Sequence, residues 1–230
     1  MRTALALTLA ALTPALAACG EQAAPQSAPP PPPPSEARSA PPAREVNGGC
    51  KQVDAPKPGT DGSLEAPKAR LDPKASYEAT VKTNCGSFAF ELDLDAAPKA
   101  AASFAALARR GFFDGTVFHR IAPGFVIQGG DPTGTGSGGP GYSTKDTPPS
   151  DAAYTKGVVA MAKSADEAPG TAGSQFFVVT GPDIGLPAEY AVLGKVTAGL
   201  DVVQRIGRLG DSAEQPTATV LVQDLTVAKK

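Results

Sequence analysis

The chain has 230 residues, of which 41% are hydrophobic, and a formal net charge of −2 at pH 7. This length and composition indicate one soluble globular domain with additional segments. A charge so close to zero, without any basic cluster, argues against a nucleic-acid partner.

The N-terminus has the pattern of an export signal. Arg2 is followed by an apolar stretch from Ala4 to Leu12, and the tetrapeptide Leu16-Ala17-Ala18-Cys19 comes next. The apolar stretch is too short for a membrane-spanning helix. The tetrapeptide resembles the lipobox of bacterial lipoproteins, which predicts a signal peptide at residues 1–18 and a lipid on Cys19. An ordinary secretory signal, cut just before this cysteine, is the alternative.

Residues 19–73 are rich in proline and alanine and include the run Pro29–Pro34. Such a composition cannot bury enough apolar surface to fold, and it favours extended polyproline II structure. We interpret the segment as a lipid-anchored tether that ends in a lead-in containing Cys50; a peptide ligand for a partner protein is the alternative. The tether would reach about 40 Å if flexible and about 170 Å as polyproline II, enough to hold a domain clear of a membrane.

Cys50 and Cys85 are the cysteines that remain after Cys19. An exported chain lies in a compartment where disulfides persist. A bridge would attach the lead-in to the edge of the domain. We therefore predict a disulfide between Cys50 and Cys85, with two free thiols as the alternative.

The folded domain is predicted to cover residues 74–230, and it begins with a hairpin. Residues 77–83 and 87–95 alternate apolar and polar side chains around a turn, which is typical of two strands with one buried face. On this pattern Asp93 and Asp95 lie together on one face of a strand. A solvated face is a simpler account of them than an acid–base pair.

Two helices and several more strands follow this hairpin. Residues 95–111 predict a helix, because Pro98 suits a first turn and Gly111 a C-terminal end. Short apolar runs bounded by Gly or Pro come next, then a second helix at residues 199–209 and a last strand at residues 217–227. Many short strands with two helices predict an all-β fold, a closed antiparallel barrel capped by the helices.

The segment around the only histidine, His119, suggests several chemistries that its surroundings exclude. Gly134-x-Gly136-x-x-Gly139 formally matches a dinucleotide fingerprint, but prolines flank it and no helix follows to receive a pyrophosphate. One histidine and no C-x-x-C pair leave too few ligands for a metal site. A lone histidine in an apolar strand more often packs than catalyses. We therefore predict no metal and no cofactor.

A different set of residues predicts a half-polar groove. Arg120 is followed by Phe125, Val126 and Gln128, and a second group containing Gln175 and Phe177 comes later in the chain. The guanidinium of an arginine is charged at any physiological pH. The alternative is a surface ion pair for the arginine and a core position for both phenylalanines.

These segments resemble the two signature segments of the cyclophilins, a family of peptidyl-prolyl cis-trans isomerases. Residues 118–142 and 170–180 carry the signatures, and the resemblance extends over about residues 76–228. It implies an eight-stranded antiparallel barrel with two capping helices and no metal or cofactor.

By position, the resemblance assigns a role to each residue of the predicted groove. Arg120 matches the catalytic arginine, and Gln128 matches the glutamine that orients it. Lys163 stands where the family usually has asparagine, which affects side-chain preference more than chemistry. The remaining substrate-binding positions are Phe125, Val126, Ala162, Gln175, Phe177, Leu186 and Tyr190.

The resemblance implies an isomerase that acts on X-Pro peptide bonds without making or breaking a covalent bond. With the export signal, it predicts an enzyme on the extracytoplasmic side of a membrane that assists the folding of exported proteins. The expected partners are proline-containing segments of those proteins and the membrane itself, through the lipid; we expect a monomer. A non-enzymatic proline-peptide binder, or a holding chaperone at the cell envelope, is the alternative.

Overall fold

The computed structural model describes residues 45–46 and 49–230 of the chain. The predicted signal peptide, Cys19 and most of the tether lie outside the described residues. The strands are β1 Glu45–Val46, β2 Cys50–Lys51, β3 Tyr77–Thr83, β4 Gly86–Leu92, β5 Arg120–Ala122, β6 Val126–Gly129, β7 Thr144–Lys145, β8 Val158–Met161, β9 Thr171–Ala172, β10 Phe176–Val179, β11 Val192–Ala198 and β12 Val222–Lys229, and the helices are α1 Pro98–Ala108 and α2 Leu200–Ile206.

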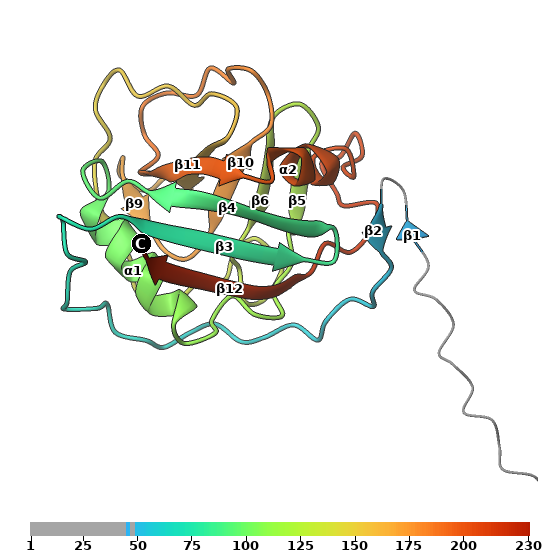
Figure 1. Cartoon of the computed structure of the whole chain (residues 1–230), viewed down its shortest axis with the longest axis horizontal. Coiled ribbons are helices and arrows are strands. Elements are labelled where there is room, and N and C mark those ends of the chain that lie inside the picture. Colours follow the sequence, from blue (N-terminus) through green and yellow to red (C-terminus); the bar gives the residue numbers. More distant parts are fainter. Residues whose placement is uncertain (1–44, 47–48) are drawn as a thin grey trace, which may run out of the picture. The chain divides into compact units, whose positions relative to one another are not determined.

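Eight strands form one antiparallel sheet in the order β12-β3-β4-β11-β8-β10-β6-β5, and two short pairings, β1-β2 and β7-β9, lie outside it (Figure 1). The predicted all-β fold with eight antiparallel strands and two helices is therefore confirmed. Among the described residues, neither helix has the length and apolar character that a membrane span requires.

The sheet curls, so that the residues just before edge strand β5 meet the residues just before the other edge strand, β12. Val117, which precedes β5, forms a bridge with Leu221, which precedes β12. The Phe118 N–H donates to the Val220 carbonyl beside this bridge (3.0 Å). In the part of the chain that the structure describes, no continuous ladder joins β5 to β12. Closure into a complete barrel thus stays a prediction.

The predicted hairpin is β3-β4, and its turn is hydrogen-bonded to two distant segments. Asn84 in the turn donates to the carbonyls of Lys51 (2.7 Å) and Thr219 (2.9 Å), and its Oδ1 accepts from the Leu221 N–H (2.8 Å). Asparagine suits this place because its amide both donates and accepts. The turn therefore fixes the lead-in segment and the start of the last strand to the same end of the sheet.

The centre of the molecule is a cluster of fully buried phenylalanines. The Phe104 ring from α1 lies 4.8 Å from Phe113, 5.5 Å from Phe176 and 5.7 Å from Phe90, measured between centroids. Offset and edge-to-face contacts of this kind add about 0.5–1.5 kcal/mol per pair beyond the burial of apolar area. The helix is thus fixed to the sheet by one aromatic side chain that contacts several strands and loops.

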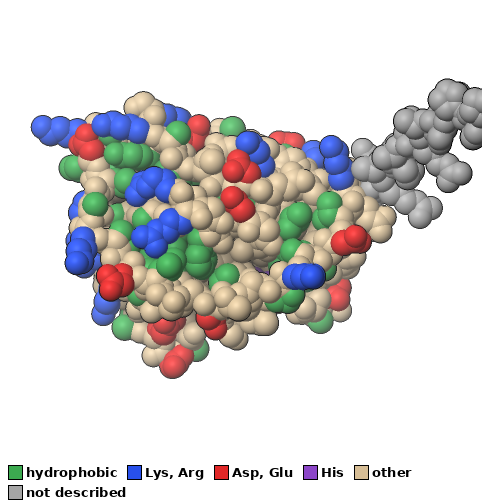
Figure 2. All heavy atoms as spheres, turned by 90° about the horizontal axis from the view of Figure 1, so that it is seen from below, with side chains coloured by type: hydrophobic (Ala, Val, Ile, Leu, Met, Phe, Trp, Pro, Cys, Tyr) green, Lys and Arg blue, Asp and Glu red, His purple; other side chains and the backbone are tan. Residues whose placement is uncertain are grey.

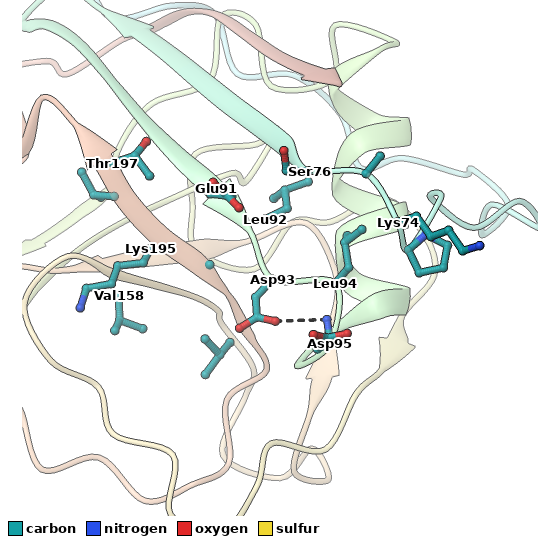
Figure 3. Close-up of a pocket in the computed structure, with 15 residues that line it drawn as sticks. Lys74, Ser76, Glu91, Leu92, Asp93, Leu94, Asp95, Val158, Lys195 and Thr197 are labelled. Carbon is teal, nitrogen blue, oxygen red and sulfur yellow. Dashed lines mark hydrogen bonds between the residues drawn. The ribbon is translucent and has the colours of Figure 1, made fainter. Parts of the chain in front are cut away.

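The start of α1 differs from the expectation for Asp93 and Asp95. Strand β4 ends at Leu92, so both aspartates lie in the turn before the helix. The Asp93 Oδ1 accepts hydrogen bonds from the N–H groups of Asp95 (3.1 Å) and Ala96 (2.8 Å). Figure 3 shows the first of these bonds at the end of the strand. Asp93 stabilises a turn, as Asp side chains commonly do. The observed strand is therefore shorter than the alternating pattern predicts.

The N-terminus of α1 has its cap on a remote loop. The Asp146 Oδ2, in the loop after β7, accepts from the backbone N–H groups of Lys99 (2.8 Å) and Ala100 (2.7 Å). The residue at the N-cap position itself is Ala97, which has no side-chain hydrogen bond to offer. A carboxylate at this end of a helix both satisfies free donors and interacts favourably with the helix dipole.

We predict that Asp146→Ala lowers the free energy of unfolding by about 1–2 kcal/mol, because two helix N–H groups lose their acceptor. Chemical denaturation measures the effect. Asp151→Ala is the matched control, since Asp151 is an exposed aspartate in the same loop. Equal stability of the two variants would show that the remote cap contributes nothing.

Candidate active site

Nine of the ten predicted groove residues line one pocket of about 300 Å³. They come from β5, β6 and β10, from the turn between β5 and β6, from the chain directly after β8, and from the loop between β10 and β11. The tenth, Gln175, is hydrogen-bonded to Gln128 next to the pocket. The lining residues are Arg120, Phe125, Val126, Gln128, Ala162, Lys163, Phe177, Leu186 and Tyr190.

Strand register explains why residues far apart in the sequence meet here. Arg120 in β5 is paired directly with Gln128 in β6, and Gln128 is paired directly with Phe177 in β10. Residues opposite each other in antiparallel strands point to the same face of a sheet. The sheet therefore places a cation, an amide and an aromatic ring in one row across three strands.

Hydrogen bonds hold the Arg120 guanidinium from two sides. Its Nε donates to the Glu214 Oε2 at 2.6 Å, and its Nη1 donates to the Gln128 Oε1 at 3.2 Å. The guanidinium carbon also lies 5.8 Å from the centroid of the Phe125 ring. The arginine side chain stays 34% exposed, so its remaining donors are accessible from the pocket. The predicted surface ion pair and the predicted groove position are thus both present.

Gln175 extends this arrangement to the glycine-rich loop. The Gln128 Nε2 donates to the Gln175 Oε1 (3.0 Å), and the Gln175 Nε2 donates to the carbonyls of Gly136 (2.9 Å) and Gly138 (3.0 Å). We call the set Arg120–Gln128–Gln175, with these two carbonyls, the amide relay. Each amide accepts on one side and donates on the other, so the relay fixes their orientation.

Asp131 holds the glycine-rich loop in shape from inside. Its carboxylate is fully buried and accepts from the Thr133 N–H (2.7 Å), the Gly136 N–H (2.6 Å) and the Gly138 N–H (3.1 Å). Burial by itself raises the pKa of Asp131, but the hydrogen bonds from Thr133, Gly138 and Gly136 outweigh it and hold the pKa below its usual value. The glycines that imitate a nucleotide-binding loop are therefore wrapped around a carboxylate of the protein itself.

The apolar side of the pocket is built from aromatic rings. Phe177 and Tyr190 meet edge to face, with centroids 5.5 Å apart. Tyr154 packs behind both rings, and its hydroxyl donates to the Tyr190 carbonyl (2.7 Å) and accepts from the Tyr190 N–H (2.9 Å). These contacts make the wall rigid, and the buried phenol of Tyr154 fixes the position of Tyr190, the outer ring of the wall.

Lys163 is turned away from solvent, although it lines the pocket. Its side chain is 2% exposed, and its Nζ lies 3.0 Å from the Glu189 carboxylate and 5.6 Å from the centre of the Tyr190 ring. The charge is compensated by the carboxylate and by the ring face. The long side chain that replaces the family's asparagine therefore forms part of the wall.

His119 lies outside the pocket, in agreement with the prediction that it does not catalyse. Burial lowers its pKa; the Asp131 carboxylate raises it and the Arg120 charge lowers it, and the net direction is down. Its Nδ1 is buried without a hydrogen-bond partner. A ring in such surroundings stays neutral near pH 7.

Two residues of the site were missed by the sequence analysis. Glu214 is 94 positions from Arg120, in a loop that no motif marks. Tyr154 lies in a loop that departs from the family pattern and has no apolar periodicity. A positive φ of 62° at Glu214 is the structural sign of a special position, and it is visible only in the backbone.

A larger cavity of about 730 Å³ lies elsewhere, beside the end of β4 (Figure 3). It contains Glu91, Asp93, Asp95 and Lys195 but none of the predicted groove residues. We assign the chemistry to the smaller pocket, because only there do a fixed cation and an apolar wall converge. In the described part of the chain, no cluster of His, Cys, Asp or Glu is arranged to hold a metal ion.

Cys50 and Cys85 are joined in the structure as a disulfide across 35 positions of sequence. The bridge lies at the hairpin turn, next to the Lys51 N–H bond to the Asn84 carbonyl (2.8 Å). The lead-in is therefore attached covalently and by hydrogen bonds at the same point.

The site is of the class that places a fixed guanidinium beside an aromatic pocket. Comparison with known proteins identifies the family of this chain. Residues 79–227 match the family described as cyclophilin type peptidyl-prolyl cis-trans isomerase/CLD. This match covers most of the chain, and the chain belongs to that family.

Curated relatives agree with this assignment. Peptidyl-prolyl cis-trans isomerase B of Bacillus subtilis is 46% identical over 118 residues, which are 51% of this chain and 80% of that protein. Peptidyl-prolyl cis-trans isomerase-like 1 of Emericella nidulans is 42% identical over 134 residues, 56% of this chain and 81% of that protein. Peptidyl-prolyl cis-trans isomerase-like 2 of Cryptococcus neoformans is 39% identical over 162 residues, 67% of this chain. The chain spans only 28% of the length of that last protein.

A solved structure shows the same fold. A Cryptosporidium parvum cyclophilin-type isomerase, crystallised in the presence of the dipeptide Ala-Pro, is 33% identical. The TM-score is 0.61, and the alignment covers 66% of this chain and 99% of that chain. The shared part is thus the sheet with its two helices, while the segment before β3 is outside the family match.

The lowered pKa of His119 gives a prediction for stability. Because the folded state holds this histidine neutral, protonation favours the unfolded chain. The neutral histidine therefore contributes to the free energy of unfolding above about pH 6.5, and this contribution is lost as the pH falls below that value. We expect the free energy of unfolding to decrease between pH 7.5 and pH 5 in denaturant titrations. His119→Gln should flatten this slope. If the substitution leaves the slope unchanged, the decrease in unfolding free energy comes from carboxylates instead of His119.

Proposed function

We propose that this protein is a peptidyl-prolyl cis-trans isomerase that accelerates rotation about X-Pro bonds in exported proteins and thereby assists their folding. The observation that carries the proposal is the Arg120 guanidinium, held by Glu214 and Gln128 over a pocket walled by Phe177 and Tyr190. A pocket of about 300 Å³ has room for a proline ring beside the rings of Phe177 and Tyr190. The solved relative crystallised with Ala-Pro supports the same ligand class.

The chemistry requires only binding and one well-placed hydrogen bond. Amide resonance sets a rotation barrier of about 18–20 kcal/mol, and in the twisted transition state the prolyl nitrogen regains a lone pair. A guanidinium N–H donates to that lone pair more strongly than to the planar amide, so the interaction favours the transition state. The Nη2 of Arg120 has no partner among the hydrogen bonds described for the guanidinium, and it is the donor we assign to this task.

The proposed location rests on the sequence of the N-terminal segment. The lipobox-like tetrapeptide ending at Cys19 and the proline-rich tether favour a monomeric lipoprotein on the extracytoplasmic side of a membrane. The Cys50–Cys85 disulfide is of the kind that persists in such a compartment. Its substrates there would be proline-containing segments of newly exported proteins.

One observation favours the alternative of a non-enzymatic peptide binder or holding chaperone. The Glu214 carboxylate already pairs with Arg120, and an ion pair weakens the field that the cation exerts on a ligand. In that case the pocket would bind proline and contribute little to rotation. The two functions predict different behaviour of variants at these two positions.

We predict that Arg120→Ala lowers kcat/KM for an X-Pro peptide by about 10²-fold, because one charge-assisted hydrogen bond to the transition state is lost. NMR exchange or protease-coupled isomerisation measures it. Arg208→Ala, which removes an exposed arginine elsewhere, should keep wild-type activity. A wild-type domain that binds the peptide without accelerating exchange would support the binder.

Glu214 is predicted to position the arginine without contacting the substrate. Glu214→Gln keeps an acceptor for Nε, so kcat/KM should stay within about threefold of wild type, whereas Glu214→Ala should reduce it about tenfold through misorientation. KM should change less than kcat in both variants. Higher activity in the glutamine variant would contradict this role and show that the ion pair restrains catalysis.

A further inference from the structure

The chain between β2 and β3 crosses the lower side of the domain without forming a helix or strand (Figure 1). We call residues 52–76 the strap. It precedes the family match, which begins at residue 79. Figure 2 shows the side on which the strap lies: much of its centre is backbone and side chains that are neither hydrophobic nor charged, while lysines and arginines gather mainly towards one end.

The strap is hydrogen-bonded to the glycine-rich loop, backbone to backbone. The Gly59 N–H donates to the Pro132 carbonyl (2.9 Å), the Gly62 N–H to the Gly139 carbonyl (2.8 Å), and the Leu64 N–H to the Pro140 carbonyl (2.9 Å). The hydrogen bonds resemble those of a short strand paired with the loop, but they are too irregular for the segment to be a strand. It satisfies carbonyls of a loop that has few side chains of its own.

One side chain and two glycines complete the contact. The Asp61 Oδ1 accepts from the Gly139 N–H at 3.0 Å, so the strap holds both the donor and the acceptor of that residue. A Cβ on Gly62 would lie 2.7 Å from the Pro140 carbonyl oxygen, and a Cβ on Gly59 would lie 2.7 Å from the Pro132 carbonyl oxygen. Only glycine permits this approach of two backbones.

The loop residue next to this contact belongs to the active site. Gly138 adjoins Gly139, and its carbonyl, with that of Gly136, accepts the two hydrogen bonds of Gln175. From Gln175 the amide relay leads through Gln128 to the Arg120 guanidinium. Hydrogen bonds on either side of the Gly138–Gly139 peptide unit thus connect the strap to the proposed catalytic cation.

Both ends of the strap are attached to the domain. One end follows the Cys50–Cys85 disulfide, and at the other Asp72 pairs with Lys229 (3.1 Å) and its N–H donates to the Tyr77 hydroxyl (3.2 Å). Between these points Leu64 and Leu71 pack against the core. Since the chain is held at both ends, ordering the strap on the loop costs little additional entropy.

We propose that the strap is a positioning element of the active site, which holds the glycine-rich loop so that Gln175 and the amide relay orient Arg120. The inference rests on the proposed isomerase function. It implies that the family domain of this chain depends for full activity on a segment outside the family match. Loosening the strap moves the Gly136 and Gly138 carbonyls and lowers kcat, while the apolar wall continues to bind proline.

Asp61→Ala and Gly62→Ala test this in the full chain. Each should lower kcat/KM for an X-Pro peptide about three- to tenfold, mainly in kcat, because a small misplacement of a catalytic group has a large effect on rate. Asp61→Asn, which keeps an acceptor for the Gly139 N–H, should restore most of the activity. Asp54→Ala removes an exposed aspartate of the same strap and should behave as wild type.

Side-chain NMR gives a readout that does not depend on activity. The Gln175 amide and the Arg120 Nε–H resonances should shift in Asp61→Ala and Gly62→Ala and remain in place in Asp54→Ala. Variants that lower unfolding stability but leave kcat/KM and these resonances unchanged would overturn the inference and make the strap purely structural. A wild-type chain without isomerase activity would refute the proposed function instead, and the resonance shifts would still decide whether the strap positions the relay.

Discussion

A guanidinium that is held on two sides has few directions left in which to donate, and the rest of the site follows from this constraint. Arg120 is fixed by a carboxylate at its Nε and by an amide at its Nη1. Free arginine side chains sample many rotamers, and restricting them before the substrate arrives removes that entropy from the catalytic step. The sheet, the glycine-rich loop and the loop with Glu214 all contribute to this one restriction.

The pocket is packed separately from the centre of the domain. The phenylalanines around α1 belong to one buried cluster, whereas Phe177, Tyr154 and Val126 belong to a second, smaller cluster on the other face of the same strands. Alternation along a strand makes this possible: in β10, Phe176 faces the core and Phe177 faces the pocket. Changes in the pocket wall can therefore alter peptide preference with little effect on the core.

Sequence reasoning succeeded where the signal was local. Alternation predicted the β3-β4 hairpin, and two signature segments placed Arg120, Gln128 and Phe177 in one groove, where strand register puts them. It failed where contacts join segments without a motif: Glu214 meets Arg120 through a loop, and Asp146 caps a helix 46 positions away. Asp93 and Asp95 continued an alternating pattern beyond the real end of the strand, because alternation does not indicate where hydrogen bonding stops. Most of the strap falls in the predicted tether, because a segment rich in proline and alanine cannot bury enough apolar surface to fold by itself. Composition does not report on hydrogen bonding to another segment.

The contact between strap and glycine-rich loop has a consequence for how such a segment can diverge. Recognition between two main chains is indifferent to most side chains, so most strap positions other than Asp61, Leu64 and Leu71 can be replaced without disturbing it. What it cannot tolerate is an added methyl group at Gly59 or Gly62, where the neighbouring carbonyl leaves no room. The contact is therefore specific because Gly59 and Gly62 have no Cβ atom. Related proteins could share the device while their straps look unrelated, with two suitably spaced glycines and an aspartate between them as its visible trace.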